Sequence, residues 1–170
     1  AKLGAVASMI HPLSAPVEIA GYLNRSGSRI AVTLDAFYKS FAAIEEPTPL
    51  ETLVLARISD DLPLHKRLGF WATRGRKIPK VPSDPRVRWW SELMAEEDPP
   101  VPAAATGVHE PAAILYSGGT TGTPKGIVLS HSNFVSEGLQ VRAWIGLGPD
   151  DTILAALPIS MLATQSMLRS

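Results

Sequence analysis

The chain carries, at positions 116–126, the stretch Tyr116-Ser117-Gly118-Gly119-Thr120-Thr121-Gly122-Thr123-Pro124-Lys125-Gly126. Its glycines allow sharp backbone bends and let N–H groups come close to an anion. The hydroxyls of Ser117, Thr120 and Thr121 can turn toward phosphate oxygens, and Lys125 adds a mobile positive charge. The stretch therefore predicts a loop that binds a polyphosphate.

Two better-known phosphate loops do not match this stretch. The nucleoside-triphosphatase pattern requires Gly directly before the Lys and Ser or Thr after it, where this chain has Pro124 and Gly126. The dinucleotide pattern G-x-G-x-x-G is also absent. A flexible surface linker is the alternative, and the apolar residues on both sides of the stretch disfavour it.

Regular structure is expected on both sides of this loop. Ala112–Tyr116 has the pattern of a strand that runs directly into it. Ser130 is placed to cap a helix that runs to about Ile145 and ends at Gly146. Thr152–Leu157 is a further expected strand.

The first sixty residues alternate strand and helix patterns. Leu3–Ile10 predicts a strand buried on both faces. A helix should follow, capped by Ser14 and ended by Gly27, and its apolar stripe is Val17, Ile19, Ala20 and Leu23. Further expected elements are a strand at 29–34, a helix at 36–44 and a strand at 51–58. This order predicts an α/β fold with a mostly parallel sheet and flanking helices.

The middle of the chain differs in composition. Residues 62–102 are rich in proline, and the segment 66–88 holds half of the sixteen Lys and Arg residues with Asp84 as its single acid. This segment is interpreted either as a solvated loop whose charges meet acids elsewhere, which is slightly favoured, or as a contact with an anionic membrane. Trp89 and Trp90 are expected to pack an insert onto the main sheet, with an interfacial anchor as the alternative.

Composition excludes several classes of protein. The 170-residue chain has a formal net charge of zero, so no overall field would recruit nucleic acid. It has no cysteine, and no apolar run reaches the roughly 18–20 residues that span a bilayer.

Residues 1–15 resemble a secretory signal slightly, but a buried strand before a turn is favoured, and a cytoplasmic location is expected. The four histidines lack metal-ligand spacing, and no G-x-S-x-G elbow is present.

The loop and its continuation through residues 127–133 closely resemble the phosphate-binding signature of the adenylate-forming superfamily, which includes acyl-CoA synthetases, peptide-synthetase adenylation domains and luciferases. Leu3-Gly4-Ala5-Val6 and His11-Pro12-Leu13 look like another segment of this family, with His11 where Asn is usual. Within residues 66–90, three short pieces resemble the insert of bacterial long-chain fatty-acid–CoA ligases: Lys66-Arg67-Leu68, Lys77-Ile78-Pro79 and Val87-Arg88-Trp89-Trp90.

The resemblance implies an enzyme that uses ATP, Mg²⁺ and CoA to convert a fatty acid into an acyl-adenylate and then a thioester. Its partners would be these small molecules, with no nucleic acid and with peripheral membrane contact as an open alternative. The positions that match phosphate-contacting residues of the family are Ser117, Gly118, Gly119, Thr120, Thr121 and Lys125. Gly122 and Gly126 would shape the loop, and no catalytic or metal-binding residue of the family is matched.

The resemblance also implies that the chain is part of a large N-terminal domain. Residues 1–60 would be an α/β segment, 61–110 a basic, proline-rich insert and connector, and 111–170 the phosphate-loop segment. The family pattern breaks after Ile159, and the adenine-binding, magnesium-binding and catalytic-lysine motifs, with the C-terminal domain, are not found. The chain alone is therefore expected to be inactive. The alternatives are another acyl or aryl adenylating enzyme, or a non-catalytic nucleotide-binding relic.

Overall fold

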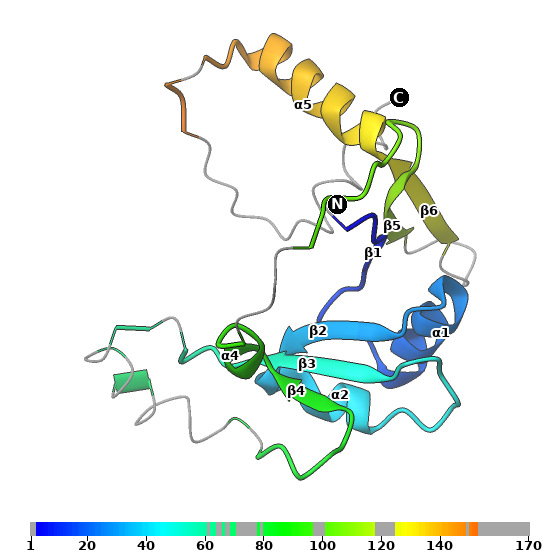
Figure 1. Cartoon of the computed structure of the whole chain (residues 1–170), viewed down its shortest axis with the longest axis vertical. Coiled ribbons are helices and arrows are strands. Elements are labelled where there is room, and N and C mark those ends of the chain that lie inside the picture. The colour runs from blue at the N-terminus through cyan, green and yellow to red at the C-terminus, as the bar shows by residue number, and fades with distance from the viewer. Residues whose placement is uncertain are drawn as a thin grey trace. The chain divides into compact units, whose positions relative to one another are not determined.

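The computed structural model describes residues 3–60, 62–63, 66, 69–70, 78, 80–96, 101–117, 125–148 and 150–152. The chain divides into two compact units (Figure 1). The first unit comprises Ala1–His11 and Pro100–Ser170, and the second comprises Pro12–Pro99. Helices and parallel strand pairs in the described residues confirm the predicted α/β class.

The second unit contains a three-stranded, wholly parallel sheet in the order β2-β3-β4. Its strands are β2 (Ile30–Leu34), β3 (Thr52–Ala56) and β4 (Val87–Trp89). The predicted strands at 29–34 and 51–58 are confirmed as β2 and β3. Strand β4 lies where the sequence predicted only an insert, because three residues are too few to show a strand pattern.

Helix α1 (Pro16–Ser26) forms at the predicted place and ends at Gly27, whose φ of 64° is left-handed. Its start differs by one residue from the prediction, since Ala15 occupies the cap position instead of Ser14. The Ala15 N–H donates to the Glu18 carboxylate at 2.9 Å, which satisfies one free donor of the first turn. The buried face is also shifted: Val17 is exposed and Tyr22 is buried in its place.

The predicted helix at 36–44 is split in two. A 3₁₀ turn, η1 (Asp35–Phe37), leads into α2 (Tyr38–Ala42). Tyr38 of α2 packs with Leu53 and Leu55 of β3 to form the core of this unit. The partly buried residues around this core are Ala31, Phe41, Val81, Val87 and Trp89.

The two adjacent tryptophans have different environments. Trp89 ends β4 and packs against the core. This agrees with the prediction that the tryptophan packs an insert onto the sheet. The Arg57 guanidinium lies over the Trp89 ring, 3.7 Å from its centroid, in a cation–π contact. Trp90 begins α4 (Trp90–Leu93) and is exposed, so the same interpretation is wrong for the second tryptophan.

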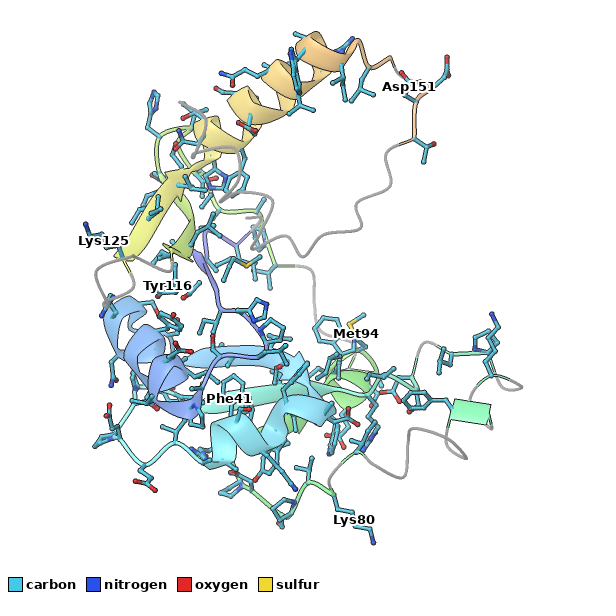
Figure 2. The ribbon with its side chains drawn as sticks, turned by 180° about the vertical axis from the view of Figure 1, so that it is seen from behind. Phe41, Lys80, Met94, Tyr116, Lys125 and Asp151 are labelled. Atoms are coloured by element: carbon cyan, nitrogen blue, oxygen red, sulfur yellow. The ribbon has the colours of Figure 1, made fainter. Side chains whose placement is uncertain are left out.

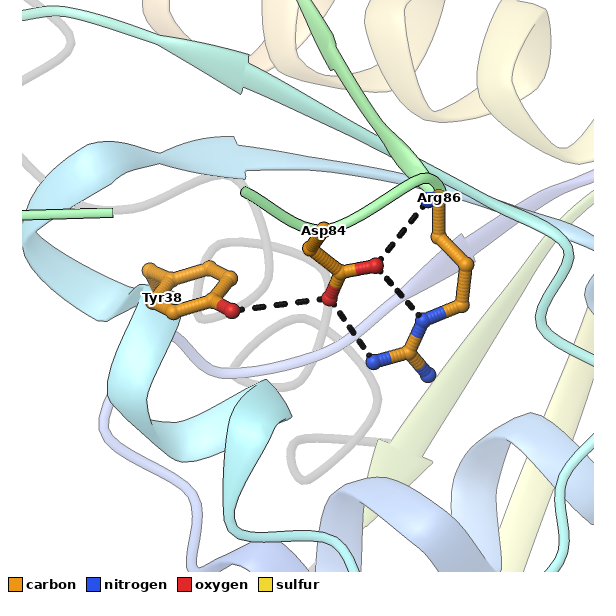
Figure 3. Close-up of polar contacts among 3 residues, drawn as sticks. All are labelled: Tyr38, Asp84 and Arg86. Atoms are coloured by element: carbon orange, nitrogen blue, oxygen red, sulfur yellow. Dashed lines mark hydrogen bonds and ion pairs between the residues drawn. The ribbon is translucent and has the colours of Figure 1, made fainter. Parts of the chain in front are cut away.

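A polar network fixes the chain just before β4 (Figure 3). The Arg86 guanidinium donates to both oxygens of Asp84, at 3.2 and 2.9 Å, and the Tyr38 hydroxyl donates to Asp84 at 3.4 Å. The hydrogen bond from Arg86 lowers the pKa of Asp84. Arg88 pairs with Glu96 at 2.7 Å. Two cations of the basic segment therefore have acidic partners within the chain.

The first unit contains a second three-stranded sheet in the order β1-β5-β6. Its strands are β1 (Ala7–Met9), β5 (Pro111–Ser117) and β6 (Lys125–Ser130); β1 is parallel to β5, and β5 is antiparallel to β6. The expectation of a doubly buried strand at 3–10 is wrong. The strand has only three residues and lies at the sheet edge, and Leu3 and Val6 before it are exposed.

Helix α5 (His131–Ile145) confirms the predicted helix, with Ser130 as its cap and Gly146 at φ 71° as its stop. The expected strand at 152–157 lies outside the described residues except for Thr152, which is not in a strand. Within the part of the chain that the structure describes, no helix combines the length and apolar character needed to cross a bilayer.

Candidate functional site

The glycine-rich stretch connects two paired strands. Ser117 and Lys125 are Cα partners at the end of the β5–β6 ladder, so residues 118–124 join the strands directly. Figure 2 labels Tyr116 and Lys125 at these neighbouring strand ends. The site is therefore at the loop end of a β-hairpin. The sequence predicted a strand followed by a loop but did not predict the second strand.

The structure brings three of the eight predicted site residues together. Ser117 is the last residue of β5, Lys125 is the first residue of β6, and Gly126 follows it. The Lys125 side chain is exposed, so its ammonium group is accessible to an anion. The remaining predicted residues lie outside the described residues: Gly118, Gly119, Thr120, Thr121 and Gly122.

Gly126 lies within strand β6, where it faces Tyr116 of β5. Its φ is not in the left-handed region, so backbone strain does not require glycine there. A Cβ at this position would lie 3.4 Å from both Tyr116 Cε1 and Ile114 Cγ2. The absence of a side chain thus leaves the surface of β6 open to the Tyr116 ring.

A contact between two hydroxyl groups lies on the same face of this sheet as Gly126, and the sequence did not predict it. The Tyr116 hydroxyl and the Ser8 hydroxyl are 3.1 Å apart and share a hydrogen bond. The two residues are separated by 108 positions, and no local pattern relates them. Only the parallel pairing of β1 with β5 brings them together.

The N-terminus of α5 is not the anion site of this hairpin. Ser130 and Asn133 cap each other's backbone N–H groups, at 2.8 and 3.3 Å. The next N–H groups, of His131 and Ser132, donate to the carbonyls of Glu110 and Val108 at 3.2 and 2.8 Å. This helix end lies at the far end of β6 from Lys125, roughly 17 Å away at the usual rise of a strand.

The site therefore differs from the loops that bind phosphate at the N-terminus of a helix. Among the described residues of this hairpin end, Lys125 at the start of β6 is the exposed cation. Among the residues that the structure describes, no group of three or more acidic, His or Cys side chains could hold a metal ion. The hairpin end can thus provide charge and hydrogen bonds to an anion, but its described residues do not form a metal site.

Known proteins are similar to this chain in sequence. The family model described as AMP-binding enzyme matches residues 1–168. A sulfoacetate–CoA ligase of Cupriavidus necator is 36% identical over half of this chain and 17% of its own length. A long-chain-fatty-acid–CoA ligase of Salmonella typhimurium is 27% identical over 93% of this chain and 29% of its own length.

A solved structure agrees with the fold. The crystal structure of a long-chain-fatty-acid–CoA ligase from Archaeoglobus fulgidus matches 96% of this chain with a TM-score of 0.67 at 24% identity, over 28% of its own length. The chain therefore spans less than a third of each of these three relatives. Because the family model covers nearly all of its residues, the chain belongs to the AMP-binding enzyme family, whose adenylate-forming members include these CoA ligases.

Proposed function

We propose that this chain provides the phosphate-binding part of an ATP-dependent CoA ligase. The observation that carries the proposal is the hairpin end, where the family's glycine- and threonine-rich residues join Ser117 to an exposed Lys125. An exposed ammonium group that is preceded in the sequence by a run rich in glycine and hydroxyl residues suits the triphosphate of ATP.

The proposed reaction has two steps. The substrate carboxylate attacks the α-phosphate of ATP, which forms an acyl-adenylate and releases pyrophosphate. The thiol of CoA then attacks the acyl carbon, and AMP leaves. In the first step Lys125 would compensate the negative charge that moves onto the leaving pyrophosphate, and Ser117 would donate to a phosphate oxygen.

Mg²⁺ and CoA belong to this proposal as a cofactor and a substrate of the complete protein. The described residues lack the clustered carboxylates that hold Mg²⁺, so no step is assigned to a metal bound by them.

We propose a long-chain fatty acid as the carboxylic substrate. Three short pieces within residues 66–90 resemble the insert of such ligases, and two of the three relatives described above are named for this substrate. The relative named for sulfoacetate represents the alternative, an acyl or aryl adenylating enzyme of other specificity.

An exchange assay with the complete natural protein tests this substrate. Radioactive pyrophosphate should enter ATP when palmitate is present, and more slowly with benzoate or sulfoacetate. Exchange that is fastest with either of the latter would refute the fatty-acid assignment and retain the ligase. No exchange with any carboxylic acid would refute the ligase itself.

We also propose that the basic segment 66–88 makes a peripheral contact with an anionic membrane. Lys66 and Lys80 are exposed, whereas Arg86 and Arg88 are paired with Asp84 and Glu96. The contact would therefore involve the cations before Asp84. Each Lys or Arg near an anionic surface contributes about 1 kcal/mol.

A further inference from the structure

Tyr116 contacts both neighbouring strands of its sheet. It lies on the central strand β5, its hydroxyl bonds to Ser8 on β1, and its ring covers Gly126 on β6. The strand register places all three residues on one face, because Ser8 pairs with Ile114 and Tyr116 pairs with Gly126. One side chain thus links the three strands on that face.

This link lies beside the two described residues that border the glycine-rich stretch. Tyr116 directly precedes Ser117 in β5, and its partner Gly126 directly follows Lys125 in β6. A shift of the Tyr116 ring would therefore move the backbone on either side of the hairpin end. Strand β1 contributes only three register pairs to the sheet, so the side-chain hydrogen bond from Ser8 is a substantial part of its attachment here.

We propose that Tyr116 and Ser8 are positioning residues for ATP, and this rests on the proposed function. Their hydrogen bond and the contact of the ring with Gly126 hold Ser117 and Lys125 at the spacing that the phosphates require. Preorganised donors act strongly because they need no rearrangement when charge develops, and displacements near 1 Å are costly. The pair acts through the strand ends and does not touch the substrate.

A purely structural role is the competing explanation. In that case loss of the hydrogen bond would lower the stability of the sheet and leave the affinity for ATP unchanged. The KM values distinguish the two explanations. A positioning role for the phosphate donors raises the KM for ATP and leaves the KM for the carboxylic acid unchanged.

The experiment is a double-mutant cycle in the complete natural protein. Tyr116→Phe, Ser8→Ala and the double variant each remove the same hydrogen bond. We expect the KM for ATP to rise about two- to tenfold in each, as loss of one hydrogen bond implies, with no further rise in the double variant. Ser8→Thr keeps the hydroxyl and should retain the wild-type KM.

The control is Ser28→Ala, which removes a comparable hydroxyl pair, Ser26 with Ser28 at 2.6 Å, in the second unit. It should leave the KM for ATP unchanged. An unchanged KM in Tyr116→Phe and Ser8→Ala would overturn the proposal. So would effects that add in the double variant, or a parallel rise in the KM for the acid with a fall in Tm.

Wild-type activity separates this proposal from the proposed function. If the wild-type protein shows no acid-dependent exchange but binds ATP in calorimetry, the same variants are compared by Kd, and a Kd that stays the same overturns the positioning role. If the wild-type protein does not bind ATP, both proposals are wrong.

Discussion

At the scale of single residues, Asp35 begins η1 directly after β2 and is buried, with 8% of its surface exposed. Its Oδ1 has no hydrogen-bond partner among the described residues. Burial raises the pKa of Asp35, and the charge of Asp60 adds to this rise. The Ala36 N–H and the charge of Arg57 oppose it. Ionised Asp35 therefore lowers the stability of the fold.

We predict that Asp35→Asn raises the free energy of unfolding at pH 7. The folded pKa lies above the unfolded pKa, so the ionised form is penalised at neutral pH. The penalty disappears as the pH falls below the unfolded value of about 3.9. Urea unfolding at pH 7 and near pH 3 should show the gain only at pH 7. An equal gain at both values, or a gain of the same size in the exposed control Asp150→Asn, would contradict this account.

Single residues also show what the sequence could predict. Lys125 and Ser117 were recognisable because their motif is continuous in the chain, and Ser130 and Gly146 because caps obey local rules. The place of Gly126 within a strand and the bond between Ser8 and Tyr116 were not predictable. Both depend on pairing between segments that are distant in sequence or separated by the loop itself.

At the scale of elements, one glycine lies within α1 and another ends it, and the two differ in backbone conformation. Gly21 is inside the helix, and Gly27 ends it with a φ of 64°. A Cβ at either position would meet no atom within 4 Å. The pair therefore isolates the backbone cost of a left-handed residue from any packing effect.

We predict opposite effects for the two alanine substitutions. Gly27→Ala should lower the free energy of unfolding by about 1 kcal/mol, because a Cβ disfavours the left-handed region. Gly21→Ala should raise it by about 0.5–1 kcal/mol, because glycine loses more conformational freedom in a helix. Urea unfolding measures both changes. If both substitutions changed stability in the same direction, the assignment of the helix end at Gly27 would be wrong.

The elements that the sequence predicted are those with a clear local pattern, namely α1, β2, β3, β5 and α5. Strand β4 was missed because its pattern is three residues long, and β6 because its apolar residues were not assigned to a strand. The sheet to which β1 belongs could not be predicted either. Its partner β5 is about one hundred positions away, and no local pattern links segments so far apart.

At the scale of the whole molecule, a neutral chain carries one strongly basic segment. We predict that the complete natural protein sediments with anionic vesicles and not with neutral ones, and that high salt abolishes this binding, because screening shortens the reach of surface charge. Replacement of Arg74, Arg76, Lys77 and Lys80 by Gln should abolish it as well. The control Lys39→Gln removes an exposed cation of α2 and should bind normally. Undiminished binding of the fourfold variant, or no binding of the wild type, would contradict the membrane contact.

We propose that the end of the β5–β6 hairpin binds the phosphates of ATP during adenylation. The most direct test is the rate of acyl-adenylate formation by Lys125→Ala in the complete natural protein, with Lys39→Ala as a matched exposed lysine in the second unit. We expect a loss of about tenfold or more for Lys125→Ala, or roughly 1.4 kcal/mol of transition-state stabilisation, and no loss for the control. A wild-type rate in Lys125→Ala would refute this role of the hairpin end.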